Sequence, residues 1–567
     1  MTISLNPGFA LLIAAALILA TPHSLRMIVA LAAALAAGAL ALTPDFGAHD
    51  MFRQVGLTVV PLRLDAASQV FGLAFTGGAI ILALAGADRR DAVEDAALLA
   101  HVGGALTAVY GGDLITFVVG AEISILAGFA LIACGRTPQA RAAAIRFLIW
   151  QAIAGALLVV GAGLVWSQTG DVRFDRLDAA TPAGLCFALA ILIRAAAPMA
   201  HVWLKDAAPR ASVAGFAALA TFTPILSIYA LLRLFTGEPW LAPIGAAAVA
   251  VGLAFAAAER APRRILAYGI VAQTGLMVMA LGVGAPLLIA GVAALAFTTV
   301  FASLLSALSI GWATVGTPRA AADAPPLWSS APVATMLAIG GGAAAMATPG
   351  FATFAAGALF HEALARQGAD WMVVVNALAI GGAVFAAGVK APLTAYFGAN
   401  ASRAPAPPFT ATLAAFVALF VLLGIGVAPG WLFALLPPSS IAFAAYDWDH
   451  LVARLQVIVA ALLAFALVAL PGAAALRRRF SGDAPIVDVD RVYRRGGVLA
   501  LTMLARGLGA LFTRWNAVLE SSSAAARRLG GLMAGLLDVP APSHGRAGQW
   551  ALVGLLAILT FCFVSVG

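Results

Sequence analysis

Long apolar runs, separated by short polar loops, are the feature that most restricts the possible folds of this 567-residue chain. Many of the runs are about 20 residues long, which is the length an α-helix needs to cross the hydrocarbon core of a bilayer. Hydrophobic residues make up 63% of the chain and charged residues only 10%, against about 25% charged residues in a typical soluble domain. The chain cannot form a water-soluble core, and we predict an all-α polytopic membrane protein.

The apolar runs predict about 14 to 16 transmembrane helices. The candidate spans are 8–21, 27–43, 66–87, 94–112, 114–134, 145–166, 180–200, 212–234, 241–258, 264–282, 285–312, 332–348, 351–365, 372–396, 409–436, 452–475 and 547–566. Residues 476–546 form a polar and amphipathic segment before the last span. The net charge of +8 comes mainly from basic residues in loops, so it is not taken as a sign of nucleic-acid binding.

Glu122 is the single charged residue in the apolar stretch 114–134. A carboxylate inside a bilayer costs a few kcal/mol, so it usually faces a wet cavity or an oppositely charged partner and has a function. This position suggests the handling of protons or cations within the membrane. A purely structural role in an ion pair is the alternative.

A second cluster of charges follows the apolar run that ends at Arg194. Within a few positions come Pro198, His201, Lys205 and Asp206. Because proline removes a backbone hydrogen bond, the helix is expected to break near Pro198, and broken helices at membrane depth line cavities. Arg194 is a natural counter-ion for Glu122, and His201, whose side chain titrates nearest neutral pH, is a candidate for passing a proton onward. A packed structural histidine is the competing interpretation.

Enzyme motifs do not occur in the sequence: there is no phosphate-binding GKS/T loop, nucleophile elbow, HExxH or CxxC. We therefore expect no cofactor and no metal site, and a transporter subunit rather than an enzyme. Whether it belongs to an NADH:quinone oxidoreductase-type translocase stays open.

Four segments resemble the antiporter-like subunits of respiratory complex I and, more closely, the D subunit of Mrp-type multisubunit cation/proton antiporters. DLITFVVGAEISILAGFALI at 113–132 resembles the family's fifth helix and places Glu122 on its essential glutamate. ILIRAAAPMAHVWLKDAAP at 191–209 resembles K-xxxxP-x-H-x-WLPDA-xxxP, and RRILAYGIVAQTG at 263–275 resembles KRxLAYSSxxQxG. VDVDRVYRR at 487–495 resembles an acidic-then-YRR segment of D-type subunits.

The resemblance implies two pseudo-symmetric inverted five-helix bundles, each with a broken helix, within a bacterial inner (plasma) membrane assembly of several subunits. The implied organisation is N-terminal helices at 1–92, half-bundles at 93–235 and 236–400, C-terminal helices at 401–475, the polar segment 476–546 and a last helix at 547–567. Glu122, Arg194, His201, Lys205 and Asp206 are then proton or ion pathway candidates in the first half.

Several positions depart from the family pattern. The seventh-helix lysine corresponds to Arg194, and arginine does not release its proton at accessible pH. Three further lysine or histidine positions fall on Ile225, Ala302 and about Gly357, while Lys390 is the basic residue retained in the second half.

The resemblance and the departures from it leave three possible functions. The chain is a transport subunit of a monovalent cation (Na⁺)/proton antiporter, a non-conducting scaffold of the same fold, or a membrane subunit of a complex I-like, hydrogenase-like or inorganic-carbon uptake complex. The expected partners are other membrane subunits, protons, monovalent cations and lipid.

Overall fold

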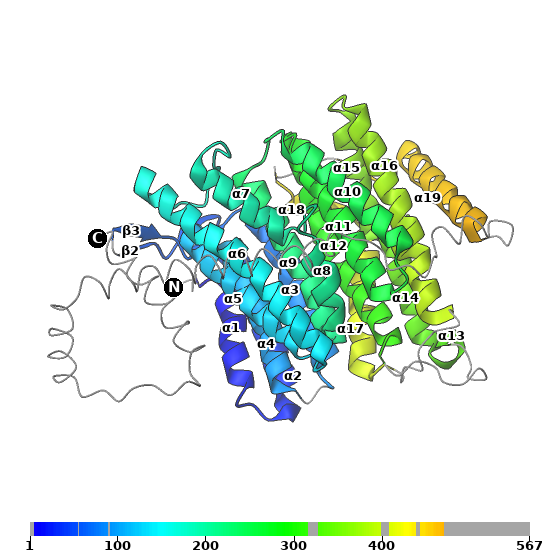
Figure 1. The fold of residues 1–567 in the computed structure, drawn as a ribbon, viewed down its shortest axis with the longest axis horizontal. Coiled ribbons are helices and arrows are strands. Elements are labelled where there is room, and N and C mark those ends of the chain that lie inside the picture. Colours follow the sequence, from blue (N-terminus) through cyan, green and yellow to red (C-terminus); the bar gives the residue numbers. More distant parts are fainter. Residues whose placement is uncertain are drawn as a thin grey trace, which may run out of the picture. The chain divides into compact units, whose positions relative to one another are not determined.

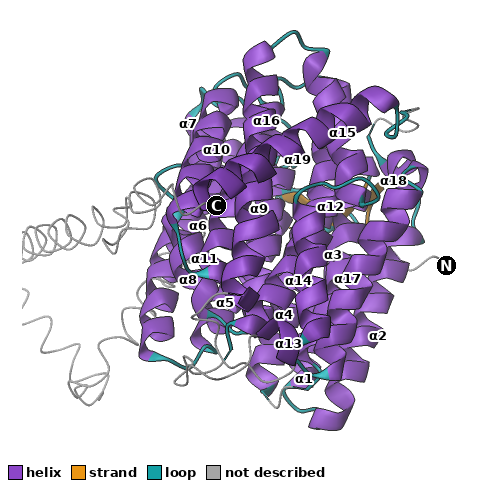
Figure 2. Cartoon of the chain, turned by 90° about the vertical axis from the view of Figure 1, so that its right-hand side faces the viewer, coloured by secondary structure: helices purple, strands orange, loops and turns teal. Residues whose placement is uncertain are grey.

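Helices make up almost all of the chain that the computed structural model describes, which is residues 5–54, 56–88, 91–315, 327–397, 407–437 and 443–469 (Figures 1 and 2). The α-helices are α1 Pro7–Ile18, α2 His23–Leu42, α3 Ala66–Gly86, α4 Ala92–Tyr110, α5 Leu114–Ala133, α6 Pro138–Thr169, α7 Pro182–Arg194, α8 Val202–Ala207, α9 Val213–Leu234, α10 Leu241–Ala258, α11 Pro262–Leu281, α12 Pro286–Ala313, α13 Leu327–Ser330, α14 Pro332–Ala345, α15 Ala352–Ala365, α16 Asp370–Ala383, α17 Phe409–Val427, α18 Gly430–Leu435 and α19 Trp448–Ala469. A short 3₁₀ turn, η1 Ala208–Arg210, and two π-helical segments, η2 Val384–Lys390 and η3 Leu393–Phe397, complete the helical elements.

Twelve helices of the described residues are long and apolar enough to cross a membrane, judged by length and composition. Three shorter apolar helices, α1, α7 and α14, accompany them. Together they confirm the prediction of an all-α polytopic membrane protein with roughly the expected number of apolar helices. The predicted segments 476–546 and 547–566 lie outside the described residues.

Three local features differ from the predicted spans. The run 409–436 is two helices, because the sequence Ala428-Pro429 ends α17 before α18 begins. The loop 44–65 contains two small antiparallel pairs, β1 (Gly47–His49) with β4 (Leu62–Leu64) and β2 (Phe52–Gln54) with β3 (Leu57–Val59). The run 372–396 is α-helical only to Ala383 and continues as π-helix toward Pro392, whose missing N–H interrupts regular hydrogen bonding.

Asp65 is the N-cap residue of α3. Its side chain accepts from the N–H of Ser68 in a capping box, and it forms an ion pair with Arg233 of α9 at 2.5 Å. Burial alone would raise the pKa of Asp65, but the Arg233 guanidinium and the Ser68 N–H outweigh it and hold the pKa below its ordinary value. This cluster joins α3 to the end of α9.

Two apolar helices are broken in the same manner. The segment between α7 and α8 contains Ala196 and Met199 with φ of 57° and 74°, and the segment between α14 and α15 contains Ala347 and Gly350 with φ of 51° and 96°. Left-handed backbone at a residue with a Cβ costs about 1–2 kcal/mol. The two breaks are those expected of an antiporter-like fold with one broken helix in each half.

Small residues let α10 and α11 approach closely, and these helices lie side by side in Figure 1. A Cβ on Gly245 would collide with the backbone N of Met279 and would lie 2.5 Å from the carbonyl O of Gly275. A Cβ on Gly252 would lie 2.6 Å from the backbone N of Ala272. Both clashes are with backbone, so no side-chain rotation relieves them, and glycine is required for this membrane helix pair.

Gly245→Ala is therefore expected to lower the free energy of unfolding of the purified chain by about 1–3 kcal/mol, the usual cost of overpacking. Gly163→Ala in α6 is the matched control, because a Cβ there meets nothing within 4 Å. The control should be neutral or stabilising by about 0.5–1 kcal/mol, since alanine favours helix over glycine. Equal effects of the two substitutions in thermal unfolding would contradict close α10–α11 packing.

Candidate ion-translocation site

Glu122 and Arg194 form an ion pair between α5 and α7, through Nη2 of Arg194 and Oε1 of Glu122. The predicted counter-ion relationship is thus present in the structure. The Arg194 side chain is only 6% exposed, whereas that of Glu122 is 31% exposed. The pair is asymmetric: its permanent charge is buried, and its titratable carboxylate has a route to the surroundings.

Gly155 of α6 provides the space for the carboxylate. A Cβ at this position would lie 2.8 Å from both carboxylate oxygens of Glu122. Such a contact is closer than real Cβ atoms adopt, so the carboxylate and α6 are in direct van der Waals contact. Three helices, α5, α6 and α7, therefore define the position of Glu122.

The helix break after Arg194 is stabilised by side chains that bind the carbonyls at the helix end. The indole Nε1 of Trp203 donates to the carbonyl O of Ile193 at 2.8 Å, and the hydroxyl of Thr274 on α11 lies 3.4 Å from the carbonyl O of Ala195. Terminal carbonyls need partners when water is excluded. The break predicted from Pro198 is confirmed, and these contacts hold Arg194 as the last residue of α7.

A small cavity adjoins the buried side of Arg194. Among its lining residues are Ser124 of α5 and Thr223 and Ser227 of α9. Ser124 extends this polar group to His101 of α4, whose Nδ1 lies 2.8 Å from the Ser124 carbonyl O and 3.1 Å from its hydroxyl. The hydroxyls of Ser124, Thr223 and Ser227 and the ring of His101 thus form a polar group on the buried side of the ion pair. The sequence did not predict this group.

His201 is fully buried in the segment before α8, and its ring lies against aromatic rings of the following helices. The ring centroids of Phe255 on α10 and Tyr268 on α11 are both 6.1 Å away. His201 therefore lies between the helices of the first half and α10 and α11. This position is compatible with either a packed histidine or a relay group.

Asp206 and Lys205 are both buried in α8. Asp206 forms ion pairs with Arg146 of α6 at 2.7 Å and with Arg210 at 2.5 Å. The structure thus places Asp206 among arginines of its own neighbourhood rather than in the Glu122–Arg194 pair.

Lys390 lies apart from these contacts, at the end of η2. Its Nζ donates to the carbonyl O of Ala257 and, at 3.3 Å, to that of Ala256, both in the last turn of α10. A cation at a helix C-terminus is favoured by the exposed carbonyls and the helix dipole. The structure therefore gives Lys390 a helix-capping contact that links η2 to α10.

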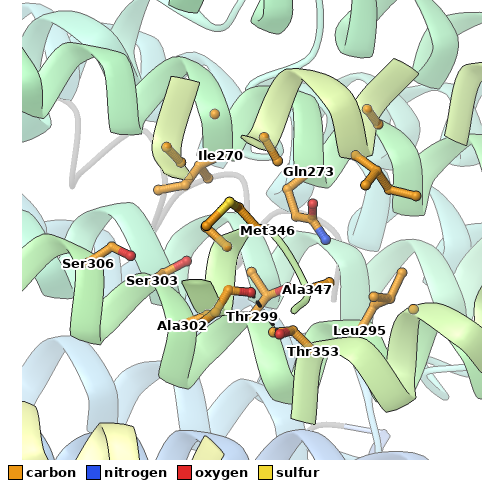
Figure 3. Close-up of a pocket in the computed structure, with 18 of the residues that line it drawn as sticks. Ile270, Gln273, Leu295, Thr299, Ala302, Ser303, Ser306, Met346, Ala347 and Thr353 are labelled. Carbon is orange, nitrogen blue, oxygen red and sulfur yellow. Dashed lines mark hydrogen bonds between the residues drawn. The ribbon is translucent and has the colours of Figure 1, made fainter. Parts of the chain in front are cut away.

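The second half contains a larger cavity, of about 120 Å³, beside the second helix break (Figure 3). A buried water needs only about 10–15 Å³ on this measure. The cavity is lined by Ala302 and Gly357, two positions where the resemblance implies basic side chains, and by Arg454 of α19. The third such position, Ile225 of α9, is buried in the apolar core.

Arg454 was not singled out in the sequence, although it lies inside the predicted span 452–475. A lone arginine in an apolar run is the same kind of signal as Glu122. Polar residues of α12 also face the cavity with helical spacing: Thr299, Ser303 and Ser306. That spacing could have indicated a polar face, but not what the face contacts.

Comparisons with known proteins identify relatives of the chain in sequence and in fold. The family model described as NADH:quinone oxidoreductase/Mrp antiporter, transmembrane region, matches residues 111–381. NADH-quinone oxidoreductase subunit N of Mycobacterium sp. (strain JLS) is 28% identical over 254 residues, which are 41% of this chain and 53% of that protein. The subunit of the same name from Desulforudis audaxviator is 34% identical over 194 residues, 30% of this chain and 38% of that protein.

Two solved structures share the fold at low sequence identity. The structure of the Mrp complex from Dietzia sp. DQ12-45-1b matches with a TM-score of 0.75 and 20% identity, covering 99% of this chain and 66% of that chain. The archaeal membrane-bound sulfane sulfur reductase matches with a TM-score of 0.67 and 18% identity, covering 98% of this chain and 99% of that chain.

Residues 111–381, a little under half of the chain, match the transmembrane family that Mrp antiporters and NADH:quinone oxidoreductase share, and the fold is that of antiporter-like membrane subunits. The chain spans about half or less of the length of the two curated relatives described. Both relatives are subunit N proteins, whereas the fold comparison includes an Mrp complex.

The ion pair makes a prediction about stability. Glu122→Gln should destabilise the chain because it leaves the Arg194 charge buried without its partner. Breaking a fully buried pair costs about 3–5 kcal/mol; partial exposure of Glu122 reduces the expected loss to about 1–3 kcal/mol. The double variant Glu122→Gln/Arg194→Gln should regain part of the lost free energy of unfolding, as measured by thermal unfolding. A double variant as unstable as the sum of the two single variants would contradict coupling between these residues.

Proposed function

We propose that this chain is a membrane subunit of a multisubunit monovalent cation (Na⁺)/proton antiporter, and that its first half-bundle, residues 93–235, handles protons at the Glu122–Arg194 pair. The observation that supports the proposal most directly is a buried ion pair whose arginine is the last residue of a broken helix. Intramembrane charges placed at irregular backbone are typical of ion pathways. The proposed location is the bacterial inner (plasma) membrane.

Glu122 is the member of the pair that exchanges a proton, because an arginine stays protonated at all accessible pH values. While the pair is closed, the Arg194 charge favours the ionised carboxylate. Opening the pair removes that attraction, so that the carboxylate can take up a proton in place of the guanidinium. Closing it again expels the proton, so a small movement of α7 relative to α5 acts as a switch.

The remaining candidates extend this pathway. His201, between the first-half helices and the α10–α11 pair, passes the proton onward. Lys205 and Asp206 follow it in α8, where the ion pairs of Asp206 with Arg146 and Arg210 respond to charge at His201. Lys390 supplies a basic group in the second half-bundle, residues 236–400. The chain itself is a transporter subunit, and its partners are other membrane subunits of the assembly.

A second candidate is a proton-translocating subunit of a redox-linked or inorganic-carbon complex. The resemblance to subunit N of NADH-quinone oxidoreductase favours it. The subunits that co-purify with the chain distinguish the two: small antiporter subunits support the first, and dehydrogenase-like, hydrogenase-like or carbonic-anhydrase-like partners support the second.

A non-conducting scaffold is the third candidate, favoured by the apolar or absent side chains at Ile225, Ala302 and Gly357. These positions argue against a full proton path through this subunit. The scaffold and the conducting subunit differ in whether Glu122 is needed for transport once the complex has assembled.

Glu122→Gln in the assembled complex is expected to lower proton-coupled Na⁺ transport in inverted vesicles by about tenfold or more, because a glutamine amide cannot take up and release a proton. Glu238→Gln is the matched control, since Glu238 pairs with Arg176 outside the helices, and transport should stay at the wild-type level. Co-purification of all subunits verifies assembly. Unchanged transport in a correctly assembled Glu122→Gln complex would leave the scaffold function.

A further inference from the structure

The buried guanidinium of Arg454 is the charge that the proposed proton pathway does not use. Arg454 is 6% exposed and lies two turns into α19, a helix that contacts α16 and η2 and otherwise buries little of its surface. Within the described ranges, Arg454 makes no ion pair and no hydrogen bond. A buried charge without compensation costs several kcal/mol, so this guanidinium requires a partner.

Gly357 of α15 is what admits the guanidinium to the cavity. A Cβ on Gly357 would lie 2.5 Å from Nη2 of Arg454. Any larger residue there would displace the charge from its place. Arg454 of α19 can therefore occupy this position only because residue 357 of α15 is glycine, and both residues line the cavity of about 120 Å³.

The other polar groups of the cavity wall are neutral. The cavity is lined by the amides of Gln273 and Asn376 and by hydroxyls of Thr299, Ser303 and Ser306, with Arg454 as its one ionisable residue among those described. Figure 3 shows Gln273, Thr299 and Ser303 around the same space. The side chains of Gln273, Thr299 and Ser303 make no hydrogen bond to other described residues, so their N–H and O–H groups can donate into the cavity. The hydroxyl of Ser306 instead donates to the carbonyl O of Gly341 at 3.2 Å.

The carboxylate of α15 does not neutralise Arg454. Glu362 accepts from Arg366 at 2.8 Å and lies 3.8 Å from His450. The amide of Asn376 is 3.3 Å from the ring of His361. The Arg454 guanidinium is thus surrounded by neutral hydrogen-bond donors, and no carboxylate of the described residues pairs with it. Such a site can bind a small anion.

We propose that this cavity binds one small monovalent anion, of the size and charge of chloride, held by Arg454 and by the donors of Gln273, Thr299 and Ser303. A single fixed positive charge compensates a single negative charge, and charge-assisted hydrogen bonds to a guanidinium are stronger than those between neutral groups. The site is independent of the Glu122 pathway, and the bound anion offsets the cost of burying Arg454.

The test is equilibrium binding of radioactive chloride to the full-length chain, purified with its co-purifying subunits in lipid nanodiscs, with gluconate replacing chloride at constant sodium. One saturable site per chain is expected. Arg454→Gln should weaken it by about tenfold or more, the loss of one charge-assisted contact, and Arg454→Lys should keep most of it because the charge remains. Arg366→Gln, which changes an exposed paired arginine directly after α15, should bind as the wild type does.

A second substitution keeps the proposal testable if Arg454→Gln does not fold. Gly357→Ala displaces the guanidinium without removing it, and it should weaken chloride binding while the protein still unfolds cooperatively. Chloride should also raise the unfolding temperature of the wild type, and by mass action the rise should follow the logarithm of the chloride concentration above the dissociation constant. Absence of saturable chloride binding in the folded wild type, or binding that Arg454→Gln and Gly357→Ala both leave unchanged, would overturn the proposal.

Discussion

Charges and broken backbone inside an apolar protein must find their partners within the protein, and this constraint governs the structure described here. At the first break, carbonyls at the end of α7 are bound by the side chains of Trp203 and Thr274. At the second, the hydroxyl of Thr353 donates to the carbonyl O of Ala344 at 2.7 Å. Each interrupted helix is therefore stabilised by a polar side chain from a neighbouring segment, and each break lies beside a cavity.

The two buried arginines, Arg194 of the first half-bundle and Arg454 of the C-terminal helices, differ in how their charges are compensated. Arg194 is neutralised by Glu122, whose carboxylate is partly exposed. Arg454 faces a cavity with neutral donors and has no carboxylate partner among the described residues. A permanent positive charge repels protons and sodium ions, so the second cavity suits an anion better than a cation. This difference separates the Glu122–Arg194 pair, proposed to handle protons, from the cavity beside Arg454.

Part of this arrangement could be predicted from the sequence. One carboxylate in a 21-residue apolar stretch indicated Glu122, and the proline after Arg194 indicated the helix break. Both are signals local to one helix. The partners of Asp206 and the aromatic surroundings of His201 depend on how α6, α10 and α11 pack, and no single helix encodes that. Arg454 was detectable as a lone charge in a span, but its cavity and Gly357 belong to other helices.

The central claim is that Glu122 is ionised at rest beside Arg194 and takes up a proton when the pair opens. Infrared difference spectroscopy of the assembled complex in proteoliposomes, with and without an imposed ion gradient, measures this directly. The account predicts loss of carboxylate bands and gain of a protonated carboxyl band under the gradient, both absent in Glu122→Gln. A Glu122 carboxyl that is already protonated at rest, or that stays ionised throughout transport, would contradict it.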